Sequence, residues 1–158
     1  MILLNLLVIE LVKKSGYPGM KILQFAFDSR EESDYLPHNY THNCVVYTGT
    51  HDNDTVMGWY DTLKGADKKL CDDYLRLKNA DGEPIPREQI PWEFVRAAMS
   101  SVADMAIIPM QDYLGLGSEA RINIPSTLGI NWKWRMGNGD FTKELAGRIR
   151  SMTKLYGR

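Results

Sequence analysis

Cysteine, clusters of basic residues and long apolar runs are all scarce in this sequence. Its 158 residues contain two cysteines, Cys44 and Cys71, too few for a disulfide framework and typical of free thiols in a reducing compartment. The 19 Lys and Arg residues are balanced by 20 Asp and Glu, and no basic run occurs. Nucleic acid and anionic membranes are therefore not expected as partners. The two free thiols make the cytoplasm the expected location.

The apolar stretch at residues 1–9 does not indicate a membrane or export segment. It is too short to span a bilayer, and Lys13 and Lys14 follow it instead of preceding it as they would in a signal peptide. We interpret it as a piece of buried helix or strand. With no repeat or low-complexity segment, the chain is expected to form one domain with its own core.

The order of the predicted elements is typical of an α/β protein. Runs rich in β-branched and aromatic residues predict strands at 21–27 and 44–47, joined by a polar loop, and the short apolar run 106–109 predicts a third strand. Apolar residues at helical spacing predict four helices: 55–63, 67–77, 92–105 and 141–155, the last on the outside of the sheet. Strands that alternate with helices imply a right-handed parallel arrangement, but three strands do not close a barrel of eight.

A cluster of polar residues follows the second predicted strand. The segment 47–55 reads Tyr-Thr-Gly-Thr-His-Asp-Asn-Asp-Thr, in which Gly49 ends the strand and Asp54 is suited to cap the next helix. Proteins of the α/β class place their chemistry at the carboxyl ends of strands. The position of His51 and Asp52 therefore predicts a binding or catalytic site, although a His-Asp pair alone is more often structural.

Two other sequence motifs do not indicate the binding sites that they usually mark. His38 and His42 have the spacing of zinc ligands on a helix, but they lie in a Pro-containing loop, which argues against a metal site. Residues 115–120 match G-x-G-x-x-A, but they do not directly follow a strand and Pro125 cuts off the required helix. A dinucleotide is therefore not expected.

Four segments share their order and spacing with one enzyme family: 18–27, 36–40, 47–60 and 117–135. With the segment around His51 and Asp52 as the most specific, they resemble the 4-α-glucanotransferases, the amylomaltase or disproportionating-enzyme family of the α-amylase-like barrels. The resemblance begins near Leu11 and covers about the last third of a family enzyme.

For the fold, the resemblance implies that residues 1–158 are a single partial domain, the C-terminal part of a (β/α)8 barrel with about its sixth to eighth strands. Residues 1–10 lack the strand end and helix start that the family has there, so this start is expected to be truncated or altered. An incomplete barrel leaves sheet edges and apolar faces uncovered. We therefore expect the chain to self-associate or to depend on missing segments.

For function, the resemblance implies transfer of a segment of an α-1,4-glucan to the 4-hydroxyl of an acceptor by a retaining mechanism, with no metal or organic cofactor. Asp52 would stabilise the transition state, while His51, Asn53, Asn123 and Phe25 would bind sugar, with Phe25 as an apolar platform. A core role for Phe25 is the competing interpretation. The nucleophile and the acid/base of retaining chemistry would lie on earlier strands, so the chain by itself is expected to be inactive.

Two alternatives stay open beside this enzyme fragment. One is a non-catalytic piece that binds α-glucan, and the other is a misassembled fragment with no activity. Turnover of maltotriose separates the enzyme from both, and a binding titration separates the remaining two. Trp132 and Trp134 belong either to the core or to the wall of a sugar groove.

Overall fold

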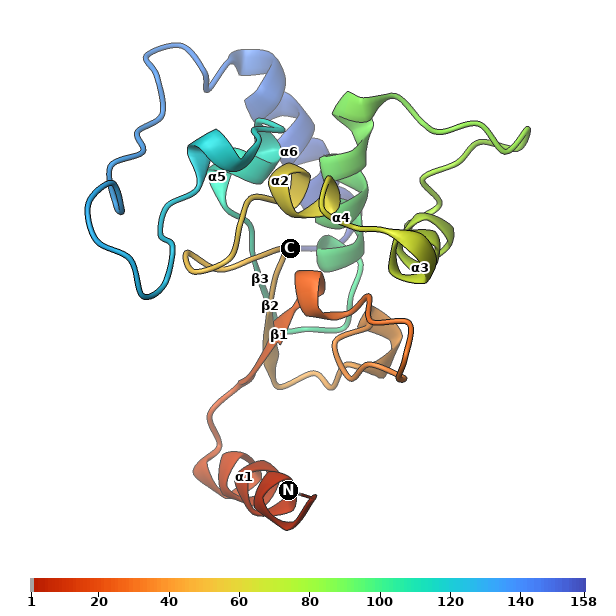
Figure 1. Cartoon of the computed structure of the whole chain (residues 1–158), viewed down its shortest axis with the longest axis vertical. Coiled ribbons are helices and arrows are strands. Elements are labelled where there is room, and N and C mark those ends of the chain that lie inside the picture. The colour runs from red at the N-terminus through yellow and green to blue at the C-terminus, as the bar shows by residue number, and fades with distance from the viewer. Residues whose placement is uncertain (1) are drawn as a thin grey trace.

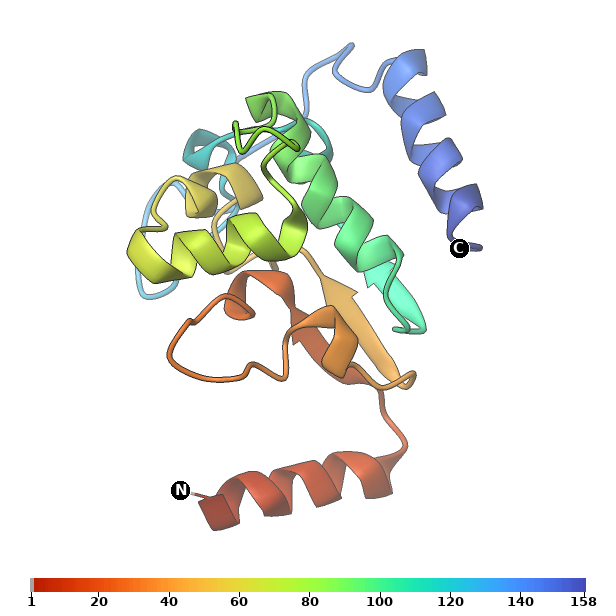
Figure 2. The same cartoon turned by 90° about the vertical axis from the view of Figure 1, so that its right-hand side faces the viewer.

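A computed structural model of the protein describes residues 2–158, with side chains described at residue 8 and from residue 10 onward. The chain begins with helix α1 (Ile2–Ser15), which stands apart at the end of the sheet where the strands begin (Figures 1 and 2). The predicted burial of residues 1–9 lies outside the described side chains except at Val8, which is exposed. No helix in the described part of the chain is long and apolar enough to cross a membrane.

Three parallel strands form one sheet in the order β1–β2–β3: β1 (Gly19–Ile22), β2 (Cys44–Tyr47) and β3 (Met105–Ile107). The register places Lys21 beside Val46, and Val46 beside Ala106. A parallel sheet whose second crossover is helical confirms the α/β class.

The other helices gather on one side of the sheet and at the carboxyl ends of its strands (Figures 1 and 2). They are α2 (Val56–Tyr60), α3 (Gly65–Leu75), α4 (Ile90–Met99), α5 (Met110–Tyr113) and α6 (Lys143–Leu155), with short 3-10 turns η1 (Leu23–Phe25), η2 (Pro37–Asn39), η3 (Arg87–Gln89) and η4 (Ser118–Ala120). Between β1 and β2 the connection carries only η1 and η2, whereas α2, α3 and α4 connect β2 to β3.

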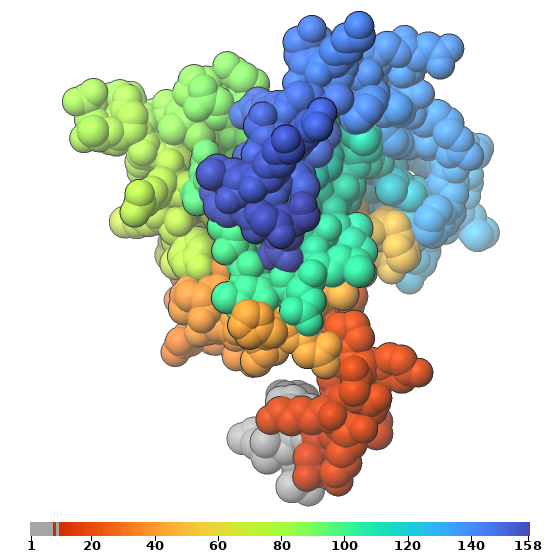
Figure 3. Space-filling model, turned by 180° about the vertical axis from the view of Figure 1, so that it is seen from behind, coloured from red at the N-terminus to blue at the C-terminus, as the bar shows by residue number. Residues whose placement is uncertain are grey.

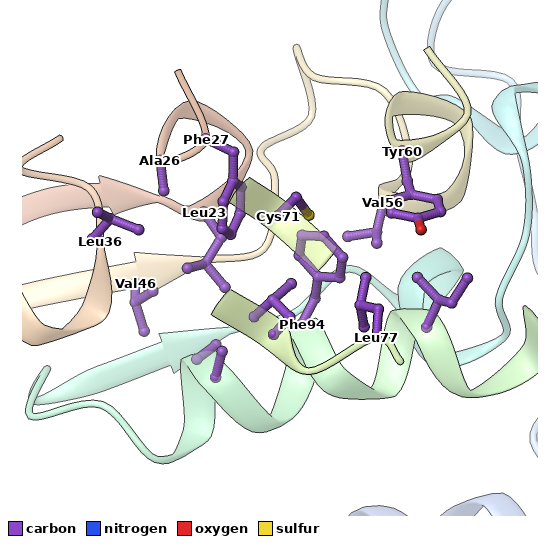
Figure 4. Packing of buried hydrophobic residues seen from close by; sticks show 14 of the residues in the cluster. Leu23, Ala26, Phe27, Leu36, Val46, Val56, Tyr60, Cys71, Leu77 and Phe94 are labelled. Carbon is purple, nitrogen blue, oxygen red and sulfur yellow. The ribbon is translucent and has the colours of Figure 1, made fainter. Parts of the chain in front are cut away.

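The main core lies between the sheet and the helices α3 and α4 (Figure 4). Phe94 of α4 is fully buried, and its ring meets that of Phe27 edge-on with centroids 6.0 Å apart. Val46 from the sheet and Cys71 from α3 complete this layer. Both cysteines are free and buried, as the composition predicted.

Helix α6 lies on the opposite face of α4 from α3 (Figures 2 and 3). Its apolar face, including Leu145 and Ile149, packs on Trp92 and Val95 of α4. The guanidinium of Arg158 donates hydrogen bonds to three carbonyl groups at and just after the end of α4, those of Met99, Ser101 and Ala103. The outer position predicted for 141–155 is confirmed, with α4 as its neighbour.

Two predicted boundaries are wrong by five residues or more. The run 21–27 is a strand only as far as Ile22, because Leu23, Ala26 and Phe27 have the i, i+3, i+4 spacing that buries all three on one side of a helical turn. The helix predicted over 92–105 ends at Met99, where the hydroxyls of two serines bond to carbonyls of the last turn.

One face of the sheet is only partly covered by the described residues. Met20, Val45 and Met105 form one row across the three strands. Ile22, Tyr47 and Ile107 form the next row, in which Ile22 is buried. Met20 is 57% exposed and Met105 53%, and the residues from β2 are half-buried. Parallel sheets normally bury both faces, so this apolar face is exceptional.

Candidate functional site

The loop 48–55 directly follows β2 and places its polar side chains at the carboxyl end of the sheet, as predicted. Its turn is closed by Asn53, whose Oδ1 accepts hydrogen bonds from the amide and the hydroxyl of Thr50 at 2.9 and 2.7 Å. Asn53 therefore shapes the loop. The N-cap of α2 is Thr55, which accepts from the amide of Gly58 at 3.1 Å, and not Asp54 as the sequence suggested.

Asp52 is the centre of a polar cluster that joins two distant segments. Its Oδ1 accepts a hydrogen bond of 2.6 Å from Nδ2 of Asn123 and lies 3.3 Å from Nε2 of His51. Arg121 donates to the backbone carbonyls of both Asp52 and Asn123, at 2.7 and 2.9 Å. About half of the Asp52 side chain stays exposed. The carboxylate is therefore oriented by its neighbours but open to a ligand.

Trp132 extends this cluster with an aromatic surface. Its ring lies 5.1 Å from that of His51, and the residue is 56% exposed. Trp132 is therefore not a core residue, and its backbone has a φ of 65°, a region that costs energy for a bulky residue. Trp134 is half-buried and lines a neighbouring hollow of about 350 Å³ together with Arg121. This volume is within the range of small-molecule sites.

Phe25 lies in η1 after β1, on a different part of the same edge of the sheet. The residue is 50% exposed, and its ring meets Tyr35 edge-on at 5.6 Å. Its neighbour Gln24 is the residue that reaches the loop: Gln24 is buried and donates a hydrogen bond of 2.8 Å to the carbonyl of Asp54. A Cβ at position 49 would lie 2.6 Å from Nε2 of Gln24, so a larger residue there would displace this side chain from its bond to Asp54.

A second carboxylate, Asp112 of α5, lies beneath the loop. It accepts hydrogen bonds from the hydroxyl of Thr48 at 2.5 Å and from the amide of Val56 at 2.8 Å. Burial raises the pKa of Asp112 to about 6, and the nearby charge of Asp54 adds to this rise, while the two hydrogen bonds oppose it. Asp54 in turn accepts from the hydroxyl of Ser118 at 2.7 Å.

Sequence reasoning missed Arg121, Asp112 and Gln24. Arg121 lies in one of the matched segments but was assigned no role. Asp112 follows β3 as His51 follows β2, so the rule that polar residues after a strand mark a site would have found it. Gln24 is a polar residue inside the apolar run 21–27, and this position could have marked it as a residue with a specific hydrogen-bond partner.

The sequence of this region matches that of known enzymes. A family model described as 4-alpha-glucanotransferase matches residues 4–140, most of the chain. The chain belongs to this family. It is 49% identical over 151 residues to the 4-alpha-glucanotransferase of Clostridium butyricum, covering 95% of this chain and 30% of that protein. It is 47% identical to a chloroplastic or amyloplastic family member from Arabidopsis thaliana, covering 96% of this chain and 26% of that one.

A solved structure extends the likeness from sequence to fold. The amylomaltase of Streptococcus agalactiae, in complex with acarbose, superposes with a TM-score of 0.86 at 36% identity, covering 96% of this chain and 29% of that one. The chain therefore spans less than a third of the family members that it matches.

Proposed function

We propose that this chain is the part of a 4-α-glucanotransferase that supplies Asp52 to the active site. The whole enzyme transfers a segment of an α-1,4-glucan to the 4-hydroxyl of an acceptor glucan or glucose, with retention of configuration. The observation that carries this proposal is the cluster in which Asn123 and His51 orient the exposed carboxylate of Asp52, in a chain that belongs to this family.

Asp52 acts as the group that stabilises the transition state. Retaining chemistry passes through an oxocarbenium-like sugar, whose hydroxyls form stronger hydrogen bonds as the ring flattens. A carboxylate held by Asn123 is suited to accept those bonds without reorganising. His51 and Asn123 bind the same sugar, and Phe25 offers an apolar platform for the acceptor glucan. Asn53 keeps the loop in shape through its bonds to Thr50, and its side-chain amide binds sugar. Two further carboxylates, nucleophile and acid/base, come from other segments.

The fold that we propose for the whole is a (β/α)8 barrel, in which β1, β2 and β3 are about the sixth to eighth strands and residues 1–158 are one partial domain. The uncovered apolar face with Met20, Val45 and Met105 supports this, because it would face the interior of the barrel. The outer edges of β1 and β3 would pair with the remaining strands.

By itself, the 158-residue chain is proposed to bind α-glucan without transferring it. Titration of the purified chain with maltotriose and with acarbose tests binding. Incubation with maltotriose, followed by analysis for glucose and longer maltodextrins, tests transfer. Binding without products is expected, and turnover that follows the chain through purification would contradict the proposal. Its uncovered face also predicts self-association, which sedimentation velocity at rising concentration measures.

Reassembly tests the active-site assignment directly. The preceding portion of the Clostridium butyricum relative, co-expressed with this chain, supplies the missing strands. Transfer is expected with the natural chain and is expected to fall by two to three decades with Asp52→Asn, the usual effect of about 3–4 kcal/mol for one preorganised transition-state contact. Asp81→Asn, on the exposed turn after α3, is the matched control and should retain activity. A loss below about fivefold for Asp52→Asn would remove Asp52 from this role.

The proposed compartment is the cytoplasm. Cys44 and Cys71 are both free and buried, and burial raises the pKa of each thiol, so neither is set up for oxidation. Cell fractionation with antibodies to the chain tests this location.

A further inference from the structure

Two consecutive buried residues of α5 each hold one of the segments that meet at Asp52. Asp112 is 1% exposed and Gln111 3% exposed, so both polar side chains are enclosed. Burial of a carboxylate and an amide costs free energy unless their hydrogen bonds are made. Where those bonds go therefore indicates what the two residues do.

Asp112 fastens both ends of the loop 48–55. One carboxylate oxygen accepts from the hydroxyl of Thr48, at the residue that follows β2, and the other accepts from the amide of Val56, the first residue of α2. That amide belongs to the first turn of a helix and has no partner within the helix, so the negative charge is well placed to satisfy it. The side chain of Asp112 thus ties together the two ends of the loop that carries His51 and Asp52.

Gln111 fastens the second segment. Its Nε2 donates a hydrogen bond of 3.2 Å to the carbonyl of Ala120, one residue before Arg121 and three before Asn123. These are the residues that bond to Asp52 across the site. Between the loop and this second segment, above Gln111 and Asp112, only about 10 Å³ of space remains, room for one water molecule at most.

We propose that Gln111 and Asp112 are positioning residues, which fix the distance between the loop 48–55 and the segment 120–123 through their shared place on α5. They do not touch the sugar. They act through Thr48, Val56 and Ala120, and loss of either bond lets the two halves of the Asp52 cluster move relative to each other. The effect on the cluster is independent of any ligand, whereas the effect on sugar binding rests on the proposed function.

A matched pair of variants in the 158-residue chain separates positioning from stability. Thr48→Val removes the hydroxyl that bonds to Asp112 and keeps the shape of the side chain. Tyr60→Phe removes a hydroxyl that bonds to Asp72 at 2.8 Å, also buried, between α2 and α3. Both lose one buried hydroxyl-to-carboxylate bond, but only the first belongs to the site.

The first readout needs no sugar. Amide hydrogen exchange of Asn53 and Val56 is expected to accelerate about tenfold more in Thr48→Val than in Tyr60→Phe, the effect of one lost buried hydrogen bond. The NMR signal of the side-chain amide of Asn123 is expected to shift in Thr48→Val and in Gln111→Met, and to stay in place in Tyr60→Phe. Thr48→Ser, which keeps the hydroxyl, should restore the natural exchange rates and the natural position of the Asn123 signal. Equal changes in Thr48→Val and Tyr60→Phe would overturn the proposal, and Gln111→Met gives the same decision if Thr48→Val does not fold.

The second readout is the dissociation constant for maltotriose. It is expected to rise about tenfold in Thr48→Val and Gln111→Met and to stay unchanged in Tyr60→Phe. If the natural chain does not bind maltotriose, the proposed binding of α-glucan by the isolated chain fails, while exchange and the Asn123 signal still decide whether α5 positions the cluster. If it binds and all three variants bind equally well, positioning of the sugar site by α5 is disproved.

Discussion

Asn123 donates a hydrogen bond of 2.6 Å to Asp52 although 71 positions separate the two residues in the chain. The bond crosses from the segment after η4 to the loop after β2, and the carboxylate that receives it remains half exposed. The same amide group is therefore available to a ligand that approaches Asp52. Changes at either residue should affect ligand binding more than folding.

Asn123→Ala is expected to weaken maltotriose binding about tenfold while lowering the free energy of unfolding by less than about 1 kcal/mol, because an exposed hydrogen bond contributes little net stability. His51→Ala should behave in the same way. Calorimetric titration and denaturant unfolding on the same samples measure the two effects. A large loss of stability with normal affinity would show both side chains to be structural.

Phe25→Ala distinguishes a sugar platform from a core residue. The ring is half exposed and meets Tyr35 edge-on, so the free energy of unfolding should fall by less than the roughly 3–5 kcal/mol typical of a buried phenylalanine. Affinity for longer maltodextrins should fall more than that for maltotriose. Phe27→Ala, at a fully packed ring, is the control for a core loss. Similar melting temperatures for the two variants would assign Phe25 to the core.

Gly58→Ala should disturb the contact that joins α2 to η4. A Cβ at this position would clash with Oγ of Ser118 and lie 2.7 Å from Oδ1 of Asp54. The expected cost is about 1–3 kcal/mol, the usual effect of overpacking. Ser118→Ala in the same chain should recover part of it by making room. Urea unfolding of the single and double variants tests this, and a fully stable Gly58→Ala would contradict it.

The raised pKa of Asp112 predicts how stability depends on pH. The folded state holds this proton with a pKa of about 6 against an ordinary value of 3.8. The higher proton affinity of the folded state adds to the free energy of unfolding, by at most about 3 kcal/mol. This addition is complete below pH 3.8 and is lost as the pH rises through about 6. Asp112→Asn cannot titrate.

Subtracting the unfolding free energy of Asp112→Asn from that of the natural chain at each pH isolates this contribution. The difference should favour the natural chain increasingly from pH 7 to pH 4. Asp54→Asn is the second control, since Asp54 is the charged neighbour that raises the pKa of Asp112. That variant should move the transition to lower pH. A difference that does not vary with pH would show that Asp112 does not titrate in this range.

Local sequence patterns predicted the strands and the loop 48–55 better than they predicted the contacts between the residues of the site. The strand 44–47 was predicted with its bounds because a β-branched run ends at a clear turn, and the position of His51 and Asp52 follows from that end. In contrast, the run 21–27 holds apolar residues at both strand and helix spacing, and only the packing of Leu23 and Phe27 decides between them.

The contacts around Asp52 depend on tertiary structure that no periodicity encodes. Trp132 contacts His51 because the irregular segment 121–131 folds back on itself. The backbone amide of Trp132 donates a hydrogen bond to the carbonyl of Ile122, which holds this fold. Such a segment lacks the repeating pattern that predicts an element. Its recognition came from the resemblance alone, and the roles of Asn53, Asn123 and Phe25 in sugar binding stay predictions.

The lengths of the two crossovers have a consequence for the order of folding. Twenty-one residues separate β1 from β2, and 57 separate β2 from β3. Closing the longer connection costs about 0.9 kcal/mol more in chain entropy, before the gain from helices that form within it. We therefore expect β1 and β2 to pair early and β3 to dock late. Since α5 follows β3, the cluster around Asp52 should take its final form only in the last kinetic phase.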